Sequence, residues 1–465
     1  MPARCRVYRG GGRSPTSPTR PIRPTCLTRL INNPMTRESM QTGTPRWPRR
    51  YCEPEWLNAL IASLLVLYGL YQLGNTYICA TKYYDLNSFQ FTEWLIDYEG
   101  GFVRRGLAGE LLHAFCRVTG LWPPGVIAAV CVVCWLGVVL FFFREFRREG
   151  CCWWLLFSPF FLGHTNDIIR KDYLSYLLII GIFTLLRGGT EKGWRVLGAT
   201  MLAVLGVFVH EAFIFYGCPL LLLALWRGKG NVVLRGLCAL LILGSFALMC
   251  LYKGDAGVAQ SVARSWDPLL GEGQVRADVL NSINALSWDT LTTMRAHLGI
   301  NVGDSEFYVG IFYQPLVLAG WFVLMSGFLR VFPVRGPLAG HERDLSALLL
   351  LSAGCLAPMF FGLSCDMIRV YQYATVSSFA AWLLLPPQML EKILPSRLLR
   401  WSRRLDVAME RRVRPGKAVM LVLLFMLGSP YGFSLRGLLD STLFHSLAQN
   451  TLHVADKIME YIGFI

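Results

Sequence analysis

Long apolar runs separated by short polar segments cover most of the chain from residue 57 onward. A helix needs about 20 apolar residues to cross about 30 Å of hydrocarbon, and fewer where the bilayer thins. The pattern therefore predicts an all-α membrane helix bundle with about 11 spans. We place these spans at 57–79, 122–143, 151–166, 173–187, 195–210, 212–226, 233–252, 307–329, 345–363, 368–387 and 418–435.

The run at 195–226 is too long for one upright helix and tight for two. His210 and Glu211 lie at its middle, and an ionisable pair at the centre of a single span is costly. We therefore predict two spans that are joined by a polar break at 210–211.

The distribution of Lys and Arg supports this prediction, because cytoplasmic loops carry an excess of both. With eleven spans and the break, every basic cluster falls on one side, which we assign as cytoplasmic together with the N-terminus. A single pass at 195–226 would put the last three clusters outside. The clusters are the N-terminal tail, 144–148, 187–195, 227–235, 330–343 and 392–417.

The opposite side then receives 80–121, 167–172, the break at 210–211, 253–306, 364–367 and the C-terminal tail. Loop 253–306 has seven acidic and four basic residues and is expected to fold over the outer face. Segment 103–118 has an apolar stripe at helical spacing, which predicts an amphipathic helix in the membrane interface after the first span. This helix would hold Arg104 and Arg105 at headgroup depth.

Composition agrees with a polytopic membrane protein, because 54% of the residues are hydrophobic and 16% are charged, against about 25% charged in soluble domains. Residues 1–50 carry eleven Arg and one acid, Glu38, and read as a disordered basic tail. This tail has no interleaved aromatic residues, so no nucleic-acid partner is expected. We assign 51–436 to the membrane domain and 437–465 to a C-terminal amphipathic segment.

The first candidate site is the segment from Asp97 to Gly106, with sequence DYEGGFVRRG. Asp97 could act as a general base on a hydroxyl nucleophile, and Arg104 and Arg105 could hold a phosphate. Glycines there let the backbone turn sharply beside a ligand. The structural alternative is an ordinary loop whose arginines contact lipid headgroups.

The second candidate is the segment from Asp167 to Asp172. Arg170 and Lys171 could bind a phosphate while an acid assists proton transfer or coordinates a divalent cation. Alternatively, the two bases extend to the membrane surface and Asp172 caps the following helix. We predict no cofactor, and the sequence leaves a divalent cation open.

Two further pairs complete the set. His210 and Glu211 could bind sugar hydroxyls, a cation or protons, or His210 could be an ordinary core residue. Asp366 and Arg369 have the i, i+3 spacing of a pair on one helix face, for which a structural ion pair is the stronger interpretation.

The layout of residues 57–190 resembles the GT-C class of integral membrane glycosyltransferases. Asp97 matches the first-loop Asp of that class, and Asp167 or Asp172 matches its second-loop acid. The resemblance implies transfer from a polyprenyl-phosphate-linked sugar at the extracytoplasmic face, in envelope polysaccharide or glycolipid assembly. On this basis we assign catalytic roles to Asp97, Asp172 and Glu211, and substrate binding to Arg104, Arg105, Asp167, Arg170, Lys171, His210, Asp366 and Arg369.

Two other functions are kept as alternatives. His210-Glu211 ahead of FIFY resembles bacterial polysaccharide polymerases of the O-antigen type. A transporter or flippase would use His210, Glu211, Asp366 and Arg369 as an intramembrane relay. The expected partners are a lipid-linked sugar and membrane lipids, the expected location is the bacterial inner membrane, and the oligomeric state is unassigned.

Overall fold

The structure is a computed structural model that describes residues 85–158, 160–162, 169–289, 291–292, 305–332, 334–364 and 366–412, with isolated positions at 63, 67, 70, 74 and 420. The predicted basic tail, most of the first span, the last span, the C-terminal amphipathic segment and Asp167 lie outside the described residues.

The regular elements of the described residues are all helices, which confirms the all-α prediction. They are α4 (Phe89–Leu95), α5 (Gly106–Thr119), α6 (Pro123–Glu149), η1 (Trp153–Phe157), α7 (Asp172–Leu186), α8 (Gly193–Val209), α9 (Phe213–Tyr216), α10 (Pro219–Arg227), α11 (Val232–Leu251), α12 (Ala256–Ser265), α13 (Asp267–Leu270), η2 (Asn284–Ser287), α15 (Ser305–Val331), α16 (Glu342–Cys355), η3 (Met359–Leu363), α17 (Met367–Leu384), α18 (Pro387–Ile393) and α19 (Ser396–Arg412).

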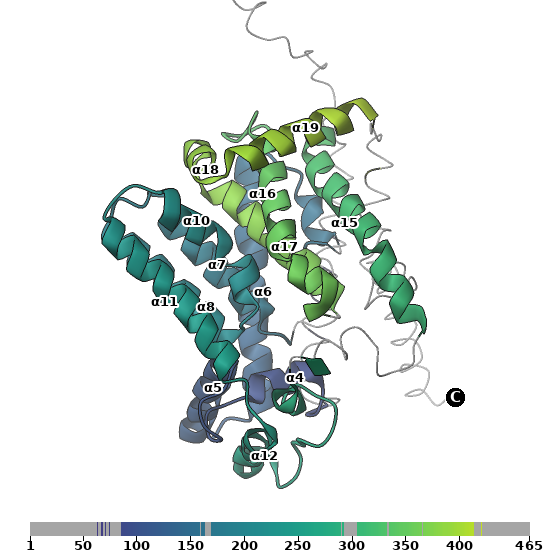
Figure 1. Cartoon of the computed structure of the whole chain (residues 1–465). Coiled ribbons are helices and arrows are strands. Elements are labelled where there is room, and N and C mark those ends of the chain that lie inside the picture. The colour runs from purple at the N-terminus through teal and green to yellow at the C-terminus, as the bar shows by residue number, and fades with distance from the viewer. Residues whose placement is uncertain are drawn as a thin grey trace, which may run out of the picture. The chain divides into compact units, whose positions relative to one another are not determined.

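Figure 1 shows the long helices side by side, with α4, α5 and α12 at one end and α18 and α19 at the other. Helix α7 contacts α6, α8 and α17, while α16 contacts α15, α17 and α19. Hydrogen bonds join Arg105, directly before α5, to Glu211 between α8 and α9 and to Lys171 directly before α7, and Asp172 of α7 bonds to the first turn of α17. Segments far apart in sequence therefore meet there.

Two helices of the described part are long and apolar enough to cross a membrane, α6 and α11. Three shorter apolar helices are α7, α8 and Pro315–Val331 of α15. Helix α6 begins with Pro123 in its first turn and ends at Gly150 in the left-handed conformation, which are the usual residues at those positions. The described residues thus form an all-helical bundle in which two helices could cross a membrane. The number of eleven spans stays a prediction.

The segment predicted as a span at 151–166 is not an α-helix over its described residues. After Gly150 the chain forms the short 3-10 helix η1 and then turns. Its apolar side chains are nevertheless buried, including Trp154, Leu155 and Phe161. Irregular backbone of this kind is tolerated at membrane depth only where protein surrounds it, so its apolar composition reflects burial in the bundle.

The polar break at 210–211 is present. Helix α8 ends at Val209, and His210 adopts an extended conformation before α9 begins at Phe213. The chain then continues into α10, which begins at Pro219. This interruption brings Glu211 to the same end as α5.

Helix α5 forms where the amphipathic stripe predicts it. Leu111, Phe115 and Val118 of that stripe are exposed, whereas Leu112 and Cys116 face the protein. A Cβ atom at Gly109 would lie 1.9 Å from the carbonyl oxygen of Ile96. Only glycine therefore allows α5 to approach the chain that follows α4 this closely.

The described part of loop 253–306 folds against residues 85–105. The Trp266 indole donates to the Leu95 carbonyl at 2.7 Å, and Ser282 Oγ donates to the Phe89 carbonyl at 2.8 Å. Arg104 contributes a backbone bond to Tyr252 and a side-chain bond to Ala285. The two longest loops of the predicted outer side therefore form one structural layer.

Candidate functional site

Ionisable side chains from several helices gather at the end of the bundle near α4 and α5. We call this group the ionic cluster and define it by its five cations, four carboxylates and one histidine. Counting the cations against the carboxylates gives a net charge of +1 with the histidine neutral. The members are Arg104, Arg105, Arg170, Lys171, Arg369, Glu93, Asp172, Glu211, Asp366 and His210.

Arg105 and Glu211 form the best-defined pair of the cluster. The Arg105 Nε donates to Glu211 Oε2 at 2.7 Å, and Nη2 donates to Oε1. Arg105 has φ 65°, the only positive φ of a non-glycine residue in the described part of the chain. A left-handed conformation at a residue with a Cβ is strained and persists where surrounding contacts hold it. The bond to Glu211 is one such contact.

Lys171 supplies a second contact to the same residue. Its Nζ donates to the backbone carbonyl of Arg105 at 3.0 Å and lies 5.9 Å from the centre of the Trp94 ring. The side chain is fully buried, and burial lowers the pKa of Lys171 to about 8. Lys171 therefore fixes the backbone at Arg105 and does not present its charge to solvent.

Asp172 and Arg369 form a second bidentate pair. Arg369 Nε and Nη2 donate to the two carboxylate oxygens of Asp172 at 2.8 and 2.9 Å, and the Tyr373 hydroxyl donates to Asp172 as well. Asp172 is the first residue of α7, where a negative charge is favoured by the helix dipole. The pair joins α7 to α17.

The predicted i, i+3 pair of Asp366 and Arg369 is the weaker contact of both residues, at 3.9 Å. Asp366 instead approaches Arg170 at 3.1 Å. One ion pair, Arg170 with Asp366, thus links the segments before α7 and α17, and a second, Asp172 with Arg369, links the two helices themselves. Of the two bases predicted in the second loop, Arg170 pairs with Asp366, and Lys171 bonds to the Arg105 carbonyl.

Glu93 of α4 is a member of the cluster that the sequence analysis did not identify. Its Oε1 lies 3.3 Å from His210 Nε2, and both side chains are buried. Burial raises the pKa of Glu93, but the charges of Arg369, His210, Arg105 and Lys171 outweigh this and leave the pKa below its usual value. The sequence signal was an acid inside the apolar run 89–96.

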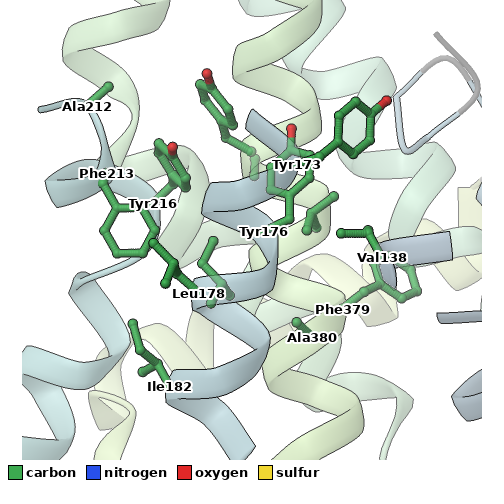
Figure 2. Close-up of a cluster of buried hydrophobic side chains, with 14 of the residues drawn as sticks. Val138, Tyr173, Tyr176, Leu178, Ile182, Ala212, Phe213, Tyr216, Phe379 and Ala380 are labelled. Atoms are coloured by element: carbon green, nitrogen blue, oxygen red, sulfur yellow. The ribbon is translucent and has the colours of Figure 1, made fainter. Parts of the chain in front are cut away.

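A layer of buried tyrosines, which belongs to the hydrophobic core, adjoins the ionic cluster. The rings of Tyr216 and Tyr373 stack with centroids 4.0 Å apart and an interplanar angle of 5°. Figure 2 shows Tyr173, Tyr176 and Tyr216 at one end of a buried cluster that continues through Leu178 and Ile182 along α7. Tyr373 couples this layer to the charges through its bond to Asp172.

Asp97 lies in a different environment from the one predicted for a general base. Its carboxylate is 0% exposed, accepts a bond from Ser265 Oγ at 2.6 Å and lies 3.3 Å from His113 Nδ1. These contacts tie the first loop to α5 and α12. Burial raises the pKa of Asp97 to about 6. The geometry thus supports a structural role for Asp97.

This raised pKa predicts a pH dependence of stability. The folded state keeps a proton on Asp97 up to a pH near 6, whereas the unfolded chain loses it near pH 4. Between these values the folded state binds more protons, so stability falls as pH rises. We expect wild type to lose about 1 kcal/mol per pH unit relative to Asp97→Asn over this window, as measured by chemical unfolding in detergent. If the unfolding free energies of wild type and Asp97→Asn changed equally with pH over this window, the prediction would be contradicted.

Three arginines of the ionic cluster have partly exposed side chains and also contact carboxylates of the cluster. The side chains of Arg104, Arg105 and Arg369 are 19, 25 and 18% exposed. We call these three residues the arginine face. Arg105 and Arg369 each use Nε and Nη2 on a carboxylate, so the orientation of each guanidinium is set in advance. Such donors suit a phosphate or another oxyanion.

The described residues contain no group of three or more His, Cys, Asp or Glu side chains that could hold a metal ion. Asp167, which we predicted as an acid of the second loop, lies outside the described residues. Apart from Asp97 and Asp167, the predicted site residues all belong to the ionic cluster. Comparison with family models, with curated proteins and with solved structures finds no match to this chain.

Proposed function

We propose that the chain is an integral membrane glycosyltransferase that uses a polyprenyl-phosphate-linked sugar donor at the extracytoplasmic face, in envelope polysaccharide or glycolipid assembly. The arginine face carries this proposal. Its guanidinium groups lie at one end of the bundle and could hold the donor phosphate by charge-assisted hydrogen bonds. The neighbouring carboxylates offset all but one of the positive charges of the ionic cluster.

The membrane placement rests on α6, α11 and α5. Helices α6 and α11 have the length and composition of spans, and α5 exposes Leu111, Phe115 and Val118 beside the ionic cluster. An exposed apolar face on an amphipathic helix suits the headgroup boundary. A lipid-borne phosphate at that depth would be level with Arg105, the residue directly before α5.

Glu211 is the group we assign as base. A donor phosphate that binds Arg105 would compete with Glu211 for the guanidinium and release the carboxylate. Glu211 would then accept the proton of the acceptor hydroxyl, whose oxygen forms the new bond to the anomeric carbon. The bond from that carbon to the phosphate oxygen breaks, and polyprenyl phosphate leaves. Asp172 keeps Arg369 directed at the same phosphate.

The test uses the full chain reconstituted in nanodiscs with radiolabelled polyprenyl-phosphate sugars and an envelope glycolipid extract. We expect label to leave the polyprenyl phosphate and appear in a larger glycolipid, as resolved by chromatography and mass spectrometry. A long ladder of products would instead identify a polysaccharide polymerase. Binding of these donors with no transfer to any acceptor would overturn the proposed activity.

One observation favours a second candidate function. The buried contact of His210 with Glu93 places a titratable group beside a carboxylate, as in proton relays of transporters. In that case proteoliposomes would take up a substrate with protons, and Glu93→Gln would abolish uptake. Proteoliposomes that transfer sugar but show no proton movement would exclude this alternative.

A further inference from the structure

Helix α19 lies across the end of the bundle opposite the ionic cluster (Figure 1). One face of α19 is fixed to the bundle. Arg330 of α15 bonds to the backbone carbonyl of Asp406 at 3.1 Å and to its carboxylate. Ser346 of α16 donates to the same carboxylate at 2.9 Å. The position of the helix, and thus the direction of its other face, is set by these bonds.

The other face of α19 combines exposed apolar and basic side chains. Trp401, Leu405 and Ala408 follow each other at i, i+4 and i+7 and are all exposed, with Trp401 at 66%. Three exposed arginines, Arg397, Arg400 and Arg404, border this stripe on one side, whereas Arg403 is exposed on the opposite side of the helix. An exposed Trp beside arginines suits the boundary of a bilayer, where the ring is buried and the cations stay with the headgroups.

The charge of α19 is strongly positive. Its sequence has six arginines against Asp406 and Glu410, which gives +6 − 2 = +4. Asp406 is buried against Arg330 and Ser346, so its charge is not presented outward. The outer face therefore complements a negative surface.

We propose that α19 docks on an anionic phospholipid surface at the end of the bundle opposite the ionic cluster. Trp401 and Leu405 enter the headgroup region, and Arg397, Arg400 and Arg404, which lie beside them, contact anionic headgroups. This inference rests on the membrane placement of the proposed function and is independent of glycosyl transfer. A failed transfer assay would leave it standing, and loss of lipid docking would leave the transferase proposal standing.

Hydrogen exchange measured by mass spectrometry on the full chain in nanodiscs tests the docking. We compare nanodiscs of phosphatidylcholine with nanodiscs in which part of the lipid is phosphatidylglycerol. Arginines near an anionic surface are attracted to its headgroups, so peptides covering 397–408 should exchange about tenfold more slowly with the anionic lipid. About 0.5 M salt should remove the difference, because it shortens the range of exposed charges to a few ångströms.

Two variants distinguish the contribution of the arginines to lipid docking from that of the apolar side chains. Arg397→Gln/Arg400→Gln/Arg404→Gln should lose the lipid dependence and keep the exchange rate seen in phosphatidylcholine. Trp401→Ala should exchange faster in both lipids and retain a difference between them. Equal exchange of α19 in the two nanodiscs would overturn the proposal, as would slowing that occurs only when a soluble acidic protein or RNA is added.

Discussion

Replacement of Arg105 by glycine is expected to abolish sugar transfer, with a loss of at least about 10³-fold in kcat/KM for the lipid donor. The reason is that the guanidinium would be the central phosphate ligand of the arginine face. Glycine is the informative substitution because Arg105 has φ 65°, which glycine adopts without strain. The backbone that connects the first loop to α5 is therefore kept while the charge is removed.

The same variant is expected to lose about 2 kcal/mol of unfolding free energy, because the partly buried Glu211 loses its charged hydrogen-bond partner. The double variant Arg105→Gly/Glu211→Gln removes this uncompensated charge and should recover most of the stability with no recovery of transfer. Chemical unfolding in detergent and initial rates measure the two effects. Arg117→Ala is the matched control, since Arg117 is exposed and pairs with the exposed Glu99. Full transfer by Arg105→Gly would refute the assigned site.

The second large effect is expected for Asp172→Asn. The change leaves Arg369 without the carboxylate that orients it, at a cost of about 2 kcal/mol for a partly buried pair. In transfer, the KM for the lipid donor should rise by about 100-fold, with a smaller fall in kcat, because Asp172 would position Arg369, the proposed phosphate ligand. Steady-state kinetics at several donor concentrations separate the two constants.

Tyr373→Phe provides the control for this prediction. It removes one hydrogen bond to Asp172 and leaves the bidentate pair with Arg369 in place. The expected loss is about 1 kcal/mol in stability and only a few-fold in KM. An equal effect of Asp172→Asn and Tyr373→Phe on the KM would show that the bond to Arg369 is not what positions the donor.

Much of the order of helices was predictable from the sequence, because charged residues, glycines and asparagines mark the ends of the apolar runs. The span predicted at 233–252 corresponds to α11 at Val232–Leu251, and that at 173–187 corresponds to α7 at Asp172–Leu186. The break at 210–211 was predicted because an ionisable pair is costly inside a helix in lipid. These are local signals.

The sequence analysis was wrong where a segment is apolar because protein surrounds it. Such a segment has the same composition as one that is surrounded by lipid. Segment 151–166 is apolar because its described part is enclosed by the bundle, and Gly150 before it and Pro159 within its sequence were the signals against a regular helix. For the same reason Glu93 was overlooked, although an acid in the apolar run of α4 was its signal.

The site was predictable as a set of residues and not as a set of pairs. Arg105 and Glu211 are 106 positions apart, and Arg369 and Asp172 are 197 apart, so no local spacing relates them. Asp97 was predicted as the base from its place in the loop. Its burial against Ser265 and His113 depends on how loop 253–306 folds back, which the acidic composition of that loop did not specify.

The brevity of the apolar helices has a consequence for the surrounding lipid. Helix α7 has 15 residues and α8 has 17, which at 1.5 Å per residue gives about 22 and 25 Å, less than the usual hydrocarbon thickness of about 30 Å. In the proposed membrane placement a bilayer would thin beside these helices, and the resulting hydrophobic mismatch would favour thinner membranes. We therefore expect the protein to partition into short-chain lipid domains when offered lipids of two chain lengths.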